Sequence, residues 1–254
     1  MKFEQLDRRM RVFETAHDHC VLPGIHMVAR IDGRSFSHLT RVAQKFDAPY
    51  DTRFRDFMVA TLRHVMNCGF STLYGYTQSD EMSVLFKRNE STFGRKLRKF
   101  DSVLAGEASA VFTLQLGAPA AFDCRISQLP SAQDVVDYFR WRHEDAARNA
   151  LNGHCYWLLR KQGLDDHEAT RRLSGVSVAD RNELLFRHGI NFNDVPAWEK
   201  RGIGVRWREV EHTGSNPKSG AETKGVRREL FTDENLPMKD AYDEYVREIV
   251  ESQG

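Results

Sequence analysis

The stretch from residue 74 to residue 86 constrains the fold of this chain more than any other segment. Two short apolar runs, typical of strands, flank a polar segment at 78–80 whose residue types favour a turn. Adjacent acids, Asp80 and Glu81, interrupt the apolar pattern at that turn. The stretch therefore predicts a β-hairpin with two carboxylates at its tip, and it raises the question of what balances their charge.

The segments around this hairpin complete a recognisable order of elements. Residues 24–36 alternate in hydrophobicity, which predicts a strand that ends at Asp32 and turns at Gly33. Residues 51–69 place their apolar side chains on one helical face, with Asp51 as N-cap. A long helix from about residue 93 and a strand at 120–127 follow. The order is βαββαβ, which predicts an α+β fold with a ferredoxin-like antiparallel sheet.

The second half of the chain has a different, mainly helical pattern. Helical periodicity covers residues 132–161, 166–173 and 178–188, and a last helix is expected near 237–251. Between them, two strand-like runs predict a late hairpin around a polar, glycine-rich loop at 213–225. We therefore divide the chain into a first domain, residues 1–131, and a helical extension with a late hairpin, residues 132–254, packed on the same unit.

Composition excludes several classes of protein. The 254 residues carry a formal net charge of +1, so any basic surface must be local. No apolar run approaches the roughly 18 residues of a membrane span, and the N-terminus lacks the apolar core of a secretory signal. The four cysteines have neither metal-binding nor disulfide spacing, which indicates reduced thiols in a cytoplasmic protein. The segment His17-Asp18-His19-Cys20 lacks a distant partner pair, so it does not predict a zinc site.

Asp32 and Asp80 are the acids that the predicted topology brings together. In a βαββαβ sheet the first and third strands are central neighbours, so both side chains are expected at the same end. Two carboxylates about 4 Å apart repel by roughly 4 kcal/mol at an effective dielectric near 20. A shared proton would relieve this repulsion, and a Mg²⁺ ion would do so better, with the carbonyl of Gly33 as an extra ligand. The alternative is structural: Asp80 is then an ordinary turn aspartate, and Asp32 caps a helix or pairs with an arginine.

A basic cluster follows the hairpin. Six cations lie between residues 87 and 99, against the single acid Glu90. Cations at the start of a helix make a phosphate site, and we expect this cluster to lie beside the acids and to bind a triphosphate. The alternative is a solvated face that balances acids elsewhere. The six are Lys87, Arg88, Arg95, Lys96, Arg98 and Lys99.

Five stretches of the chain stand out together: RIDGRSF at 30–36, APYDTRF at 48–54, YGYTQSDEMSVLFKR at 74–88, DYFRWR at 137–142 and VADRNELLF at 178–186. In this combination they resemble one known family, the tRNA(His) guanylyltransferases and their like proteins. The resemblance covers about residues 1–212 in the expected order. It implies a polymerase-palm catalytic domain that adds nucleotides to the 5′ end of tRNA, in the 3′-to-5′ direction.

The chemistry implied by the resemblance has two displacements. ATP or GTP first activates the RNA 5′ end, and the 3′-hydroxyl of an incoming nucleotide then attacks the activated phosphate. Two Mg²⁺ ions are implied as cofactors for both steps, in the two-metal arrangement of many phosphoryl-transfer enzymes. The partners implied are tRNA and nucleoside triphosphates, with no membrane, in a homotetramer.

The resemblance also assigns roles to particular residues. Asp32, Gly33 and Asp80 are implied as metal ligands, and Asp32, Asp80 and Glu81 as the catalytic acids. The implied nucleotide-binding residues are Arg30, Gly33, Arg34, Ser35, Phe36, Asp51, Ser79, Arg95, Lys96 and Lys99. Candidate RNA-binding residues are Arg140, Arg142, Arg148, Asn149 and Asn182.

One departure from the family pattern bears on the substrate. Eukaryotic guanylyltransferases follow DYFRWR with a His-Ile-Asn-Asn-Leu-Tyr-Asn stretch, whereas this chain has ARNALNG at 147–153, with Ala147 in place of the histidine. This favours the bacterial and archaeal like proteins, which resemble template-dependent enzymes that repair 5′-truncated tRNA. The alternatives left open are guanylyltransferase activity specific for tRNA(His), a non-catalytic RNA-binding module of the same fold, and a palm-type nucleotide cyclase.

Overall fold

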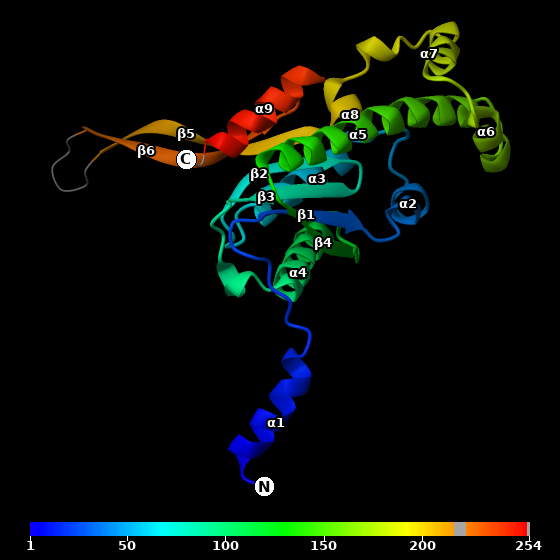
Figure 1. Cartoon of the computed structure of the whole chain (residues 1–254). Helices are drawn as coiled ribbons and strands as arrows, with labels where there is room; N and C mark the ends of the chain where they lie inside the picture. Colours follow the sequence, from blue (N-terminus) through cyan, green and yellow to red (C-terminus); the bar gives the residue numbers. More distant parts are fainter. Residues whose placement is uncertain (216–221, 253–254) are drawn as a thin grey trace.

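The central strands pair in the order that the sequence predicts. In the computed structural model of the chain, which describes residues 1–215 and 222–252, β1 (His26–Gly33) lies between β3 (Glu81–Phe86) and β4 (Phe122–Leu129). β2 (Thr72–Gln78) pairs with the other edge of β3. All these pairings are antiparallel, and the full six-stranded order is β4-β1-β3-β2-β5-β6. The predicted α+β class and ferredoxin-like core are confirmed (Figure 1).

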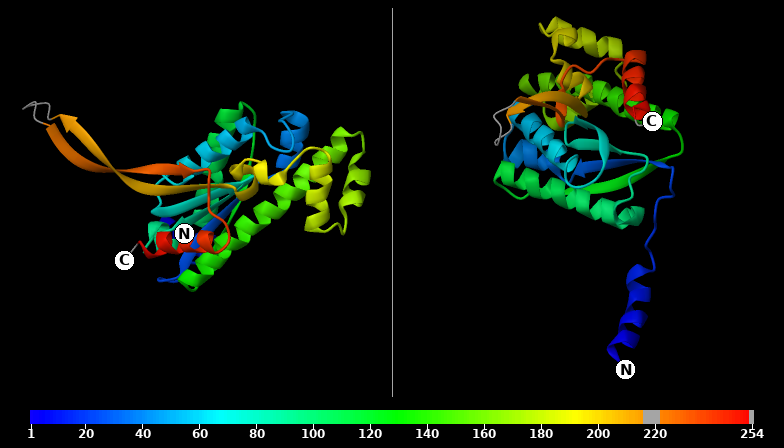
Figure 2. Two further views of the ribbon diagram at one scale, coloured as in Figure 1. Left: turned by 90° about the horizontal axis from the view of Figure 1, so that it is seen from above. Right: turned by 90° about the vertical axis from the view of Figure 1, so that its left-hand side faces the viewer.

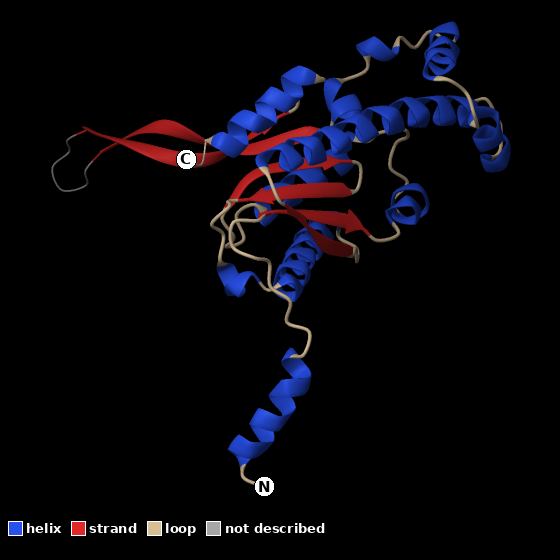
Figure 3. Ribbon diagram, in the orientation of Figure 1, coloured by secondary structure: helices blue, strands red, loops and turns tan. Residues whose placement is uncertain are grey.

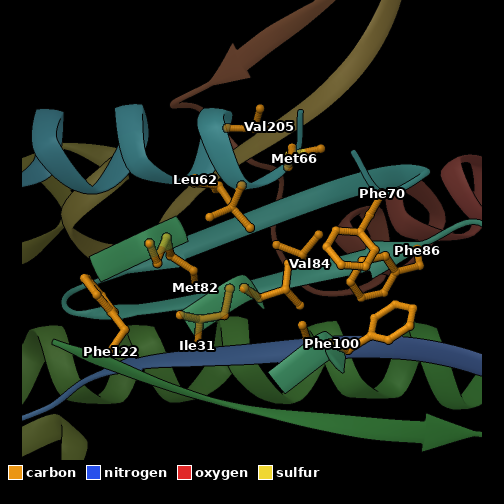
Figure 4. Close-up of a cluster of buried hydrophobic side chains, with 14 of the residues drawn as sticks. Ile31, Leu62, Met66, Phe70, Met82, Val84, Phe86, Phe100, Phe122 and Val205 are labelled. Atoms are coloured by element: carbon orange, nitrogen blue, oxygen red, sulfur yellow. The ribbon is translucent and has the colours of Figure 1, made fainter. Parts of the chain in front are cut away.

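Alternation along the strands separates two hydrophobic cores. Met27, Ala29 and Ile31 of β1 point toward α3 (Thr52–Val65) and α4 (Leu97–Leu116). Val28 points to the opposite face, toward α5 (Ala132–Lys161) and α9 (Asp240–Glu251). Figure 4 shows the first core, in which side chains of α3, α4 and the strands interdigitate. The sheet is therefore buried on both faces, and its strand ends are the positions left for polar groups.

The helices of the extension begin and end close to their predicted bounds. α5 opens with a capping box in which Ser131 and Asp134 satisfy each other's backbone amides. α6 (Asp166–Leu173) and α7 (Val178–Arg187) pack on the last turns of α5 around a third apolar cluster. They lie at the end of α5 that extends past the sheet (Figure 3).

The late hairpin joins the main sheet. β5 (Ile203–Ser215) pairs with β2 over residues 203–206 and with β6 (Glu222–Asp233) along its whole length. The predicted loop at 213–225 is therefore partly strand, and residues 216–221 lie outside the described residues. Beyond the pairing with β2, the hairpin extends away from the body as an arm (Figure 2).

Several short elements were not predicted. α2 (Phe36–His38) and a π-helical turn (Leu39–Ala43) follow β1, and a 3-10 turn (Thr92–Arg95) precedes α4, which therefore begins later than expected. A 3-10 turn (Phe192–Asp194) and α8 (Ala197–Arg201) connect α7 to β5. α1 (Phe3–Thr15) stands apart from the rest of the molecule. No described helix is long and apolar enough to span a membrane.

Candidate active site at one end of the sheet

Asp32 and Asp80 lie at the same end of the two central strands. Asp32 is the register partner of Glu81 in the β1–β3 pair. The amide of Gly33 donates to the carbonyl oxygen of Asp80 over 3.0 Å, which fixes the β2–β3 turn against the end of β1. The sheet therefore brings the two acids together as the topology predicted.

These two carboxylates have no ion-pair partner among the described residues, although the charges of Arg30 and Arg125 act on Asp32. Burial raises the pKa of Asp80 to about 6, and the nearby Asp32 carboxylate adds to that increase. Burial, followed by the charge of Glu81, also raises the pKa of Asp32. Within residues 1–215 and 222–252, neither acid forms an ion pair, and Asp80 accepts a 3.1 Å hydrogen bond from the Ser79 hydroxyl. Such a pair of carboxylates favours a proton or a cation.

Glu81, although adjacent to Asp80, has its charge balanced. Its two carboxylate oxygens meet the guanidinium groups of Arg30 and Arg142, the latter at 2.5 Å. The Trp141 ring lies 4.6 Å from the Arg142 guanidinium carbon and 6.0 Å from that of Arg30. Strand alternation points Glu81 and Asp80 into different surroundings. Glu81 therefore holds β1, β3 and α5 together, and Arg30 is engaged in the same network.

The loop after β1 is shaped by a close approach of Phe36 to Gly33. A Cβ atom on Gly33 would lie 2.5 Å from the Phe36 ring, so a side chain at this position would displace that ring. Phe36 is buried in the first core and also lines a cavity beside Asp80, so it supports the loop and its contact with a nucleotide stays a prediction. Ser35 adopts a left-handed backbone conformation with φ 61°, and Arg34 and Ser35 are exposed. The exposed residues of this loop are therefore Arg34 and Ser35, whereas Gly33 itself is buried.

Two cavities open beside Asp80. The smaller, of about 160 Å³, is lined by residues of the 36–58 segment and by Asp80, Trp157 and Trp198. The larger, of about 450 Å³, runs along β2 and α5 and includes Asp145 and Asn149. Aromatic walls next to carboxylates suit a heterocyclic base joined to phosphates. The residues common to both cavities are Ser37, Arg41, Pro49, Tyr50, Gln78, Ser79, Asp80 and Trp157.

Asp51 lines the smaller cavity as part of the scaffold. Its carboxylate accepts from the Arg53 amide at 2.8 Å, which caps α3, and from the Arg53 guanidinium at 2.6 Å. The hydrogen bond from the Arg53 side chain lowers the pKa of Asp51 to about 2. Its charge is therefore balanced, unlike that of Asp80.

Sequence reasoning did not single out the aromatic residues of these cavities. Tyr50 and Trp198 meet edge to face with ring centroids 5.7 Å apart, and His154 lies 2.9 Å from the Glu199 carboxylate behind them. Tyr50 lies inside the quoted APYDTRF stretch, so its position next to Asp51 was the available signal. Trp157 and Trp198 come from α5 and α8, which only the tertiary structure places beside Asp80.

The basic cluster lies at the opposite end of the sheet. Arg95 is buried, and its guanidinium donates to the carbonyls of Ile25 at 2.7 Å and Glu90 at 2.8 Å. Ile25 precedes β1, whereas Asp32 is near its other end, roughly 23 Å away at about 3.3 Å per residue. The expectation that the cluster lies beside the acids is therefore wrong within one chain, because β3 carries the chain across the sheet before the cations begin.

Three other members of the cluster are also engaged. Lys96 forms a 2.8 Å ion pair with Asp18, to which Arg98 also binds. The Lys99 ammonium lies 5.6 Å from the Phe93 ring. These contacts tie the segment before β1 to the start of α4.

Most of the candidate RNA-binding residues are held in ion pairs. Arg142 is buried but lines the larger cavity, so its role in RNA binding stays a prediction. Arg140 pairs with Asp243 at 2.7 Å, and Arg148 with Asp145 at 3.3 Å. Asn149 donates to Asp145 at 3.2 Å at the wall of the larger cavity. Asn182 lies on α7, where its side chain donates to the Val178 carbonyl at 2.8 Å.

The donor set at the acid end fits a hard cation. The described part of the chain contains no group of three or more His, Cys, Asp or Glu side chains that could hold a metal ion. Mg²⁺ needs fewer protein ligands, because it keeps waters and takes one or two carboxylates plus substrate phosphates. Two carboxylates without an ion-pair partner, Asp32 and Asp80, meet that requirement.

Comparison with known proteins identifies relatives over nearly the whole chain. A family model described as tRNAHis guanylyltransferase matches residues 7–130, and one described as Thg1 C terminal domain matches residues 133–243. A probable tRNA(His) guanylyltransferase of Bos taurus is 34% identical over 238 residues, which cover 89% of this chain and 78% of the relative. A probable tRNA(His) guanylyltransferase of Drosophila melanogaster is 33% identical over 195 residues, which cover 73% of this chain and 68% of the relative.

Solved structures with the same fold include a bacterial and a yeast protein. A bacterial tRNA(HIS) guanylyltransferase (Thg1)-like protein in complex with GTP superposes with a TM-score of 0.73 at 25% identity, covering 97% of this chain and 99% of that one. The tRNA(His) guanylyltransferase of Saccharomyces cerevisiae superposes with a TM-score of 0.72 at 26% identity, and the match covers 81% of this chain and 93% of the yeast chain.

Proposed function

The chain belongs to the tRNAHis guanylyltransferase family, and from that premise we propose that it adds nucleotides to the 5′ end of tRNA in the 3′-to-5′ direction. Its reaction is nucleotidyl transfer, and its substrates are nucleoside triphosphates and a tRNA that lacks 5′ nucleotides. The observation that carries this proposal is the pair of carboxylates without an ion-pair partner, Asp32 and Asp80, of which Asp80 lines two cavities that also have aromatic walls.

Asp32, Asp80 and the Gly33 carbonyl are the groups that would hold Mg²⁺. When bound there, two such ions would polarise the phosphate oxygens and lower the pKa of the attacking hydroxyl. The chain's own residues leave both carboxylates without an ion-pair partner, because the Glu81 carboxylate binds the guanidinium groups of Arg30 and Arg142. The Gly33 amide, bonded to the Asp80 carbonyl, fixes the distance between the two strand ends.

The cavity walls account for the placement of the nucleotide. Tyr50, Trp157 and Trp198 offer faces and edges against which a base can lie, and the Ser79 hydroxyl lies beside Asp80 in the same cavity. In the activation step, a 5′-phosphate oxygen attacks the α-phosphorus of ATP or GTP and pyrophosphate leaves. In the addition step, the 3′-oxygen of the incoming nucleotide attacks the activated phosphate and AMP or GMP leaves.

Within this activity, we propose template-dependent repair of 5′-truncated tRNA. The support is the ARNALNG stretch at 147–153, which departs from the eukaryotic pattern and whose Asn149 lines the larger cavity. The full-length similarity to a bacterial like protein agrees with this. A second candidate, addition of a single G to tRNA(His), is favoured by the names of the curated relatives. The free thiols of the cysteines suit the cytoplasm, which we propose as its compartment.

A templated extension assay separates the two candidates. tRNAs that lack one 5′ nucleotide are prepared with each of the four bases opposite the gap, and each is incubated with each triphosphate and Mg²⁺. Repair predicts that the added nucleotide follows the opposing base. Addition of G alone, whatever base stands opposite, contradicts repair and supports the second candidate.

Two controls test the remaining alternatives. Asp80→Asn should add nothing, and normal addition by this variant would contradict the assignment of the acids. Triphosphate incubated without RNA should yield no cyclic nucleotide, and its appearance would identify a cyclase instead. If the folded protein binds tRNA but adds no nucleotide under any condition, it is a non-catalytic RNA-binding module.

A further inference from the structure

α1 stands clear of the other described elements of its chain, although the charge of its Glu14 acts on Arg98. Figures 1 and 2 show it projecting from the body, and none of its residues is buried. Four large apolar side chains are exposed on it: Phe3 by 78%, Leu6 by 41%, Met10 by 49% and Phe13 by 71%. An isolated helix of 13 residues is marginal in water, so a helix of this composition needs a partner to cover its apolar side.

The spacing of these four residues is that of a coiled-coil seam. Phe3, Leu6, Met10 and Phe13 are separated by three, four and three residues, which is the a-d-a-d pattern of two heptads. Val12 is the one apolar residue of α1 outside this line. A narrow seam of this kind fits another helix better than it fits the flat face of a sheet, which would call for a wider apolar stripe.

The charges that flank the seam identify a second copy of α1 as the partner. Lys2 and Arg9 occupy one flank, and Asp7 and Glu14 occupy the other. In a parallel pair, a residue on the first flank meets the residue five positions later in the other helix. Lys2 then faces Asp7 of the second copy, and Arg9 faces Glu14 of the second copy.

In an antiparallel pair, the charges that flank the seam do not meet opposite charges. Each flank then meets itself, so Lys2 and Arg9 would lie against cations and the two acids against acids. We propose that α1 pairs with α1 of a second copy of this chain as a parallel two-stranded coiled coil. This interface is independent of the proposed catalytic function, since it involves no residue of the acid end.

The segment after α1 keeps the helix in position for this pairing. Val21 is buried in the first core, and Asp18 is bound by Lys96 and Arg98. The chain is therefore fastened to the body just beyond α1, and the helix projects from that anchor. Asp7 pairs with Arg11 within the exposed helix at 2.8 Å, whereas Arg9 and Glu14 form no ion pair among the described residues.

Cysteine cross-linking tests the parallel register directly. In the full-length chain with the exposed Cys20 replaced, Cys20→Ser, the variant Leu6→Cys places a thiol in the seam, and Arg8→Cys places one on the outer face as a matched control. Under mild oxidation, Leu6→Cys should form a disulfide-linked dimer with itself, and Arg8→Cys should stay monomeric on denaturing gels. Equal cross-linking of the two variants, or of neither, would overturn the proposal. Cross-linking of Leu6→Cys to Met10→Cys in preference to itself would indicate antiparallel pairing and would also overturn it.

A charge exchange provides a second test that does not depend on disulfide geometry. Arg9→Glu and Glu14→Arg should each weaken self-association roughly tenfold by sedimentation equilibrium, because two opposite-charge contacts per dimer become like-charge contacts. An equimolar mixture of the two variants should regain the wild-type affinity, since each charge then meets its opposite. A mixture that associates no more tightly than either variant alone would contradict the parallel pairing. Circular dichroism of each variant checks that the fold is intact.

Discussion

The two ends of the central strands hold similar amounts of charge and use it differently. At one end, Asp32 and Asp80 have raised pKa values and no ion-pair partner in the part of the chain that the structure describes. At the other end, Arg95 is buried among carbonyl oxygens and Lys96 is paired with Asp18. Charge that is already balanced within the fold supports the fold, whereas charge left unbalanced is available to a ligand.

Adjacent residues repeat the same contrast. Glu81 is held by Arg30 and Arg142, and its neighbour Asp80 is held by neither. The number of charges in a motif therefore says less about function than the number of charges that lack a partner. The four predictions below test this distinction, from the largest expected effect to the smallest.

Asp80→Asn should have the largest effect, and the effects on activity and stability should have opposite signs. Loss of a metal ligand should reduce nucleotide addition at least about 10³-fold, which corresponds to about 4 kcal/mol of transition-state stabilisation. Because the folded pKa of Asp80 is raised to about 6, the cost of ionising it in the folded chain grows above the unfolded pKa of about 4 and is complete above about pH 6. The variant should therefore gain about 2 kcal/mol in free energy of unfolding at pH 8 without metal.

The gain in stability should vanish in acid. Below about pH 4 the carboxyl is protonated in both the folded and the unfolded chain, so the variant and the wild type should differ little. Urea denaturation at pH 8 and pH 4 measures this. A variant that is less stable than the wild type at pH 8 would show that the Asp80 charge is balanced within the fold after all.

Arg95→Met should behave in the opposite way to Asp80→Asn. It leaves several buried carbonyl oxygens without a donor, so the free energy of unfolding should fall by about 3 kcal/mol. The folded fraction should keep the wild-type KM for GTP, because the guanidinium lies at the far end of β1. A tenfold increase in KM with unchanged stability would make Arg95 a phosphate-binding residue instead. Urea denaturation and steady-state kinetics measure the two quantities.

Asp51→Asn distinguishes a balanced acid from an unbalanced one in the same cavity. The pKa of Asp51 is lowered to about 2, so its stabilising contribution is present above about pH 4 and is lost as the pH falls toward 2. The variant should therefore lose about 2 kcal/mol in free energy of unfolding at pH 7, and the difference should shrink below pH 4. Denaturation of both proteins between pH 7 and pH 3 checks this. A constant difference at every pH would point to lost packing and not to lost charge.

Lys96→Ala should have the smallest effect. Its ion pair with Asp18 is partly exposed, and pairs of this kind contribute about 0.2–1 kcal/mol. The free energy of unfolding should fall within that range, and the difference should decrease in 0.5 M salt. A loss of nucleotide addition with full stability would instead assign Lys96 a role in substrate binding.

Much of the fold followed from patterns in the sequence. Alternation in residues 27–31 predicted which side chains face each core, Asp51 was identified as the cap of α3, and the bounds of α5 were predicted correctly. These features depend on neighbouring residues along the chain, so the sequence contains them. The meeting of Asp32 and Asp80 followed from strand order, which the βαββαβ pattern specifies.

Features that depend on distant segments were not predicted. The basic cluster follows Asp80 closely in sequence, yet the six residues of β3 carry the chain along the sheet to its opposite end. The ion pairs of Glu81 and Arg142 join β3 to α5 and could not be read from either segment alone. α1 was not predicted because its apolar side has no partner within the chain.

The most direct test is a crystal structure of the protein with Mn²⁺ and GTP, in which the metal is located by its anomalous scattering. The account predicts metal density in contact with carboxylate oxygens of both Asp32 and Asp80, with the triphosphate on the same side and the base in the cavity beside Tyr50. Metal density away from both carboxylates, or a triphosphate held by Lys96 and Lys99 of the same chain, would contradict it.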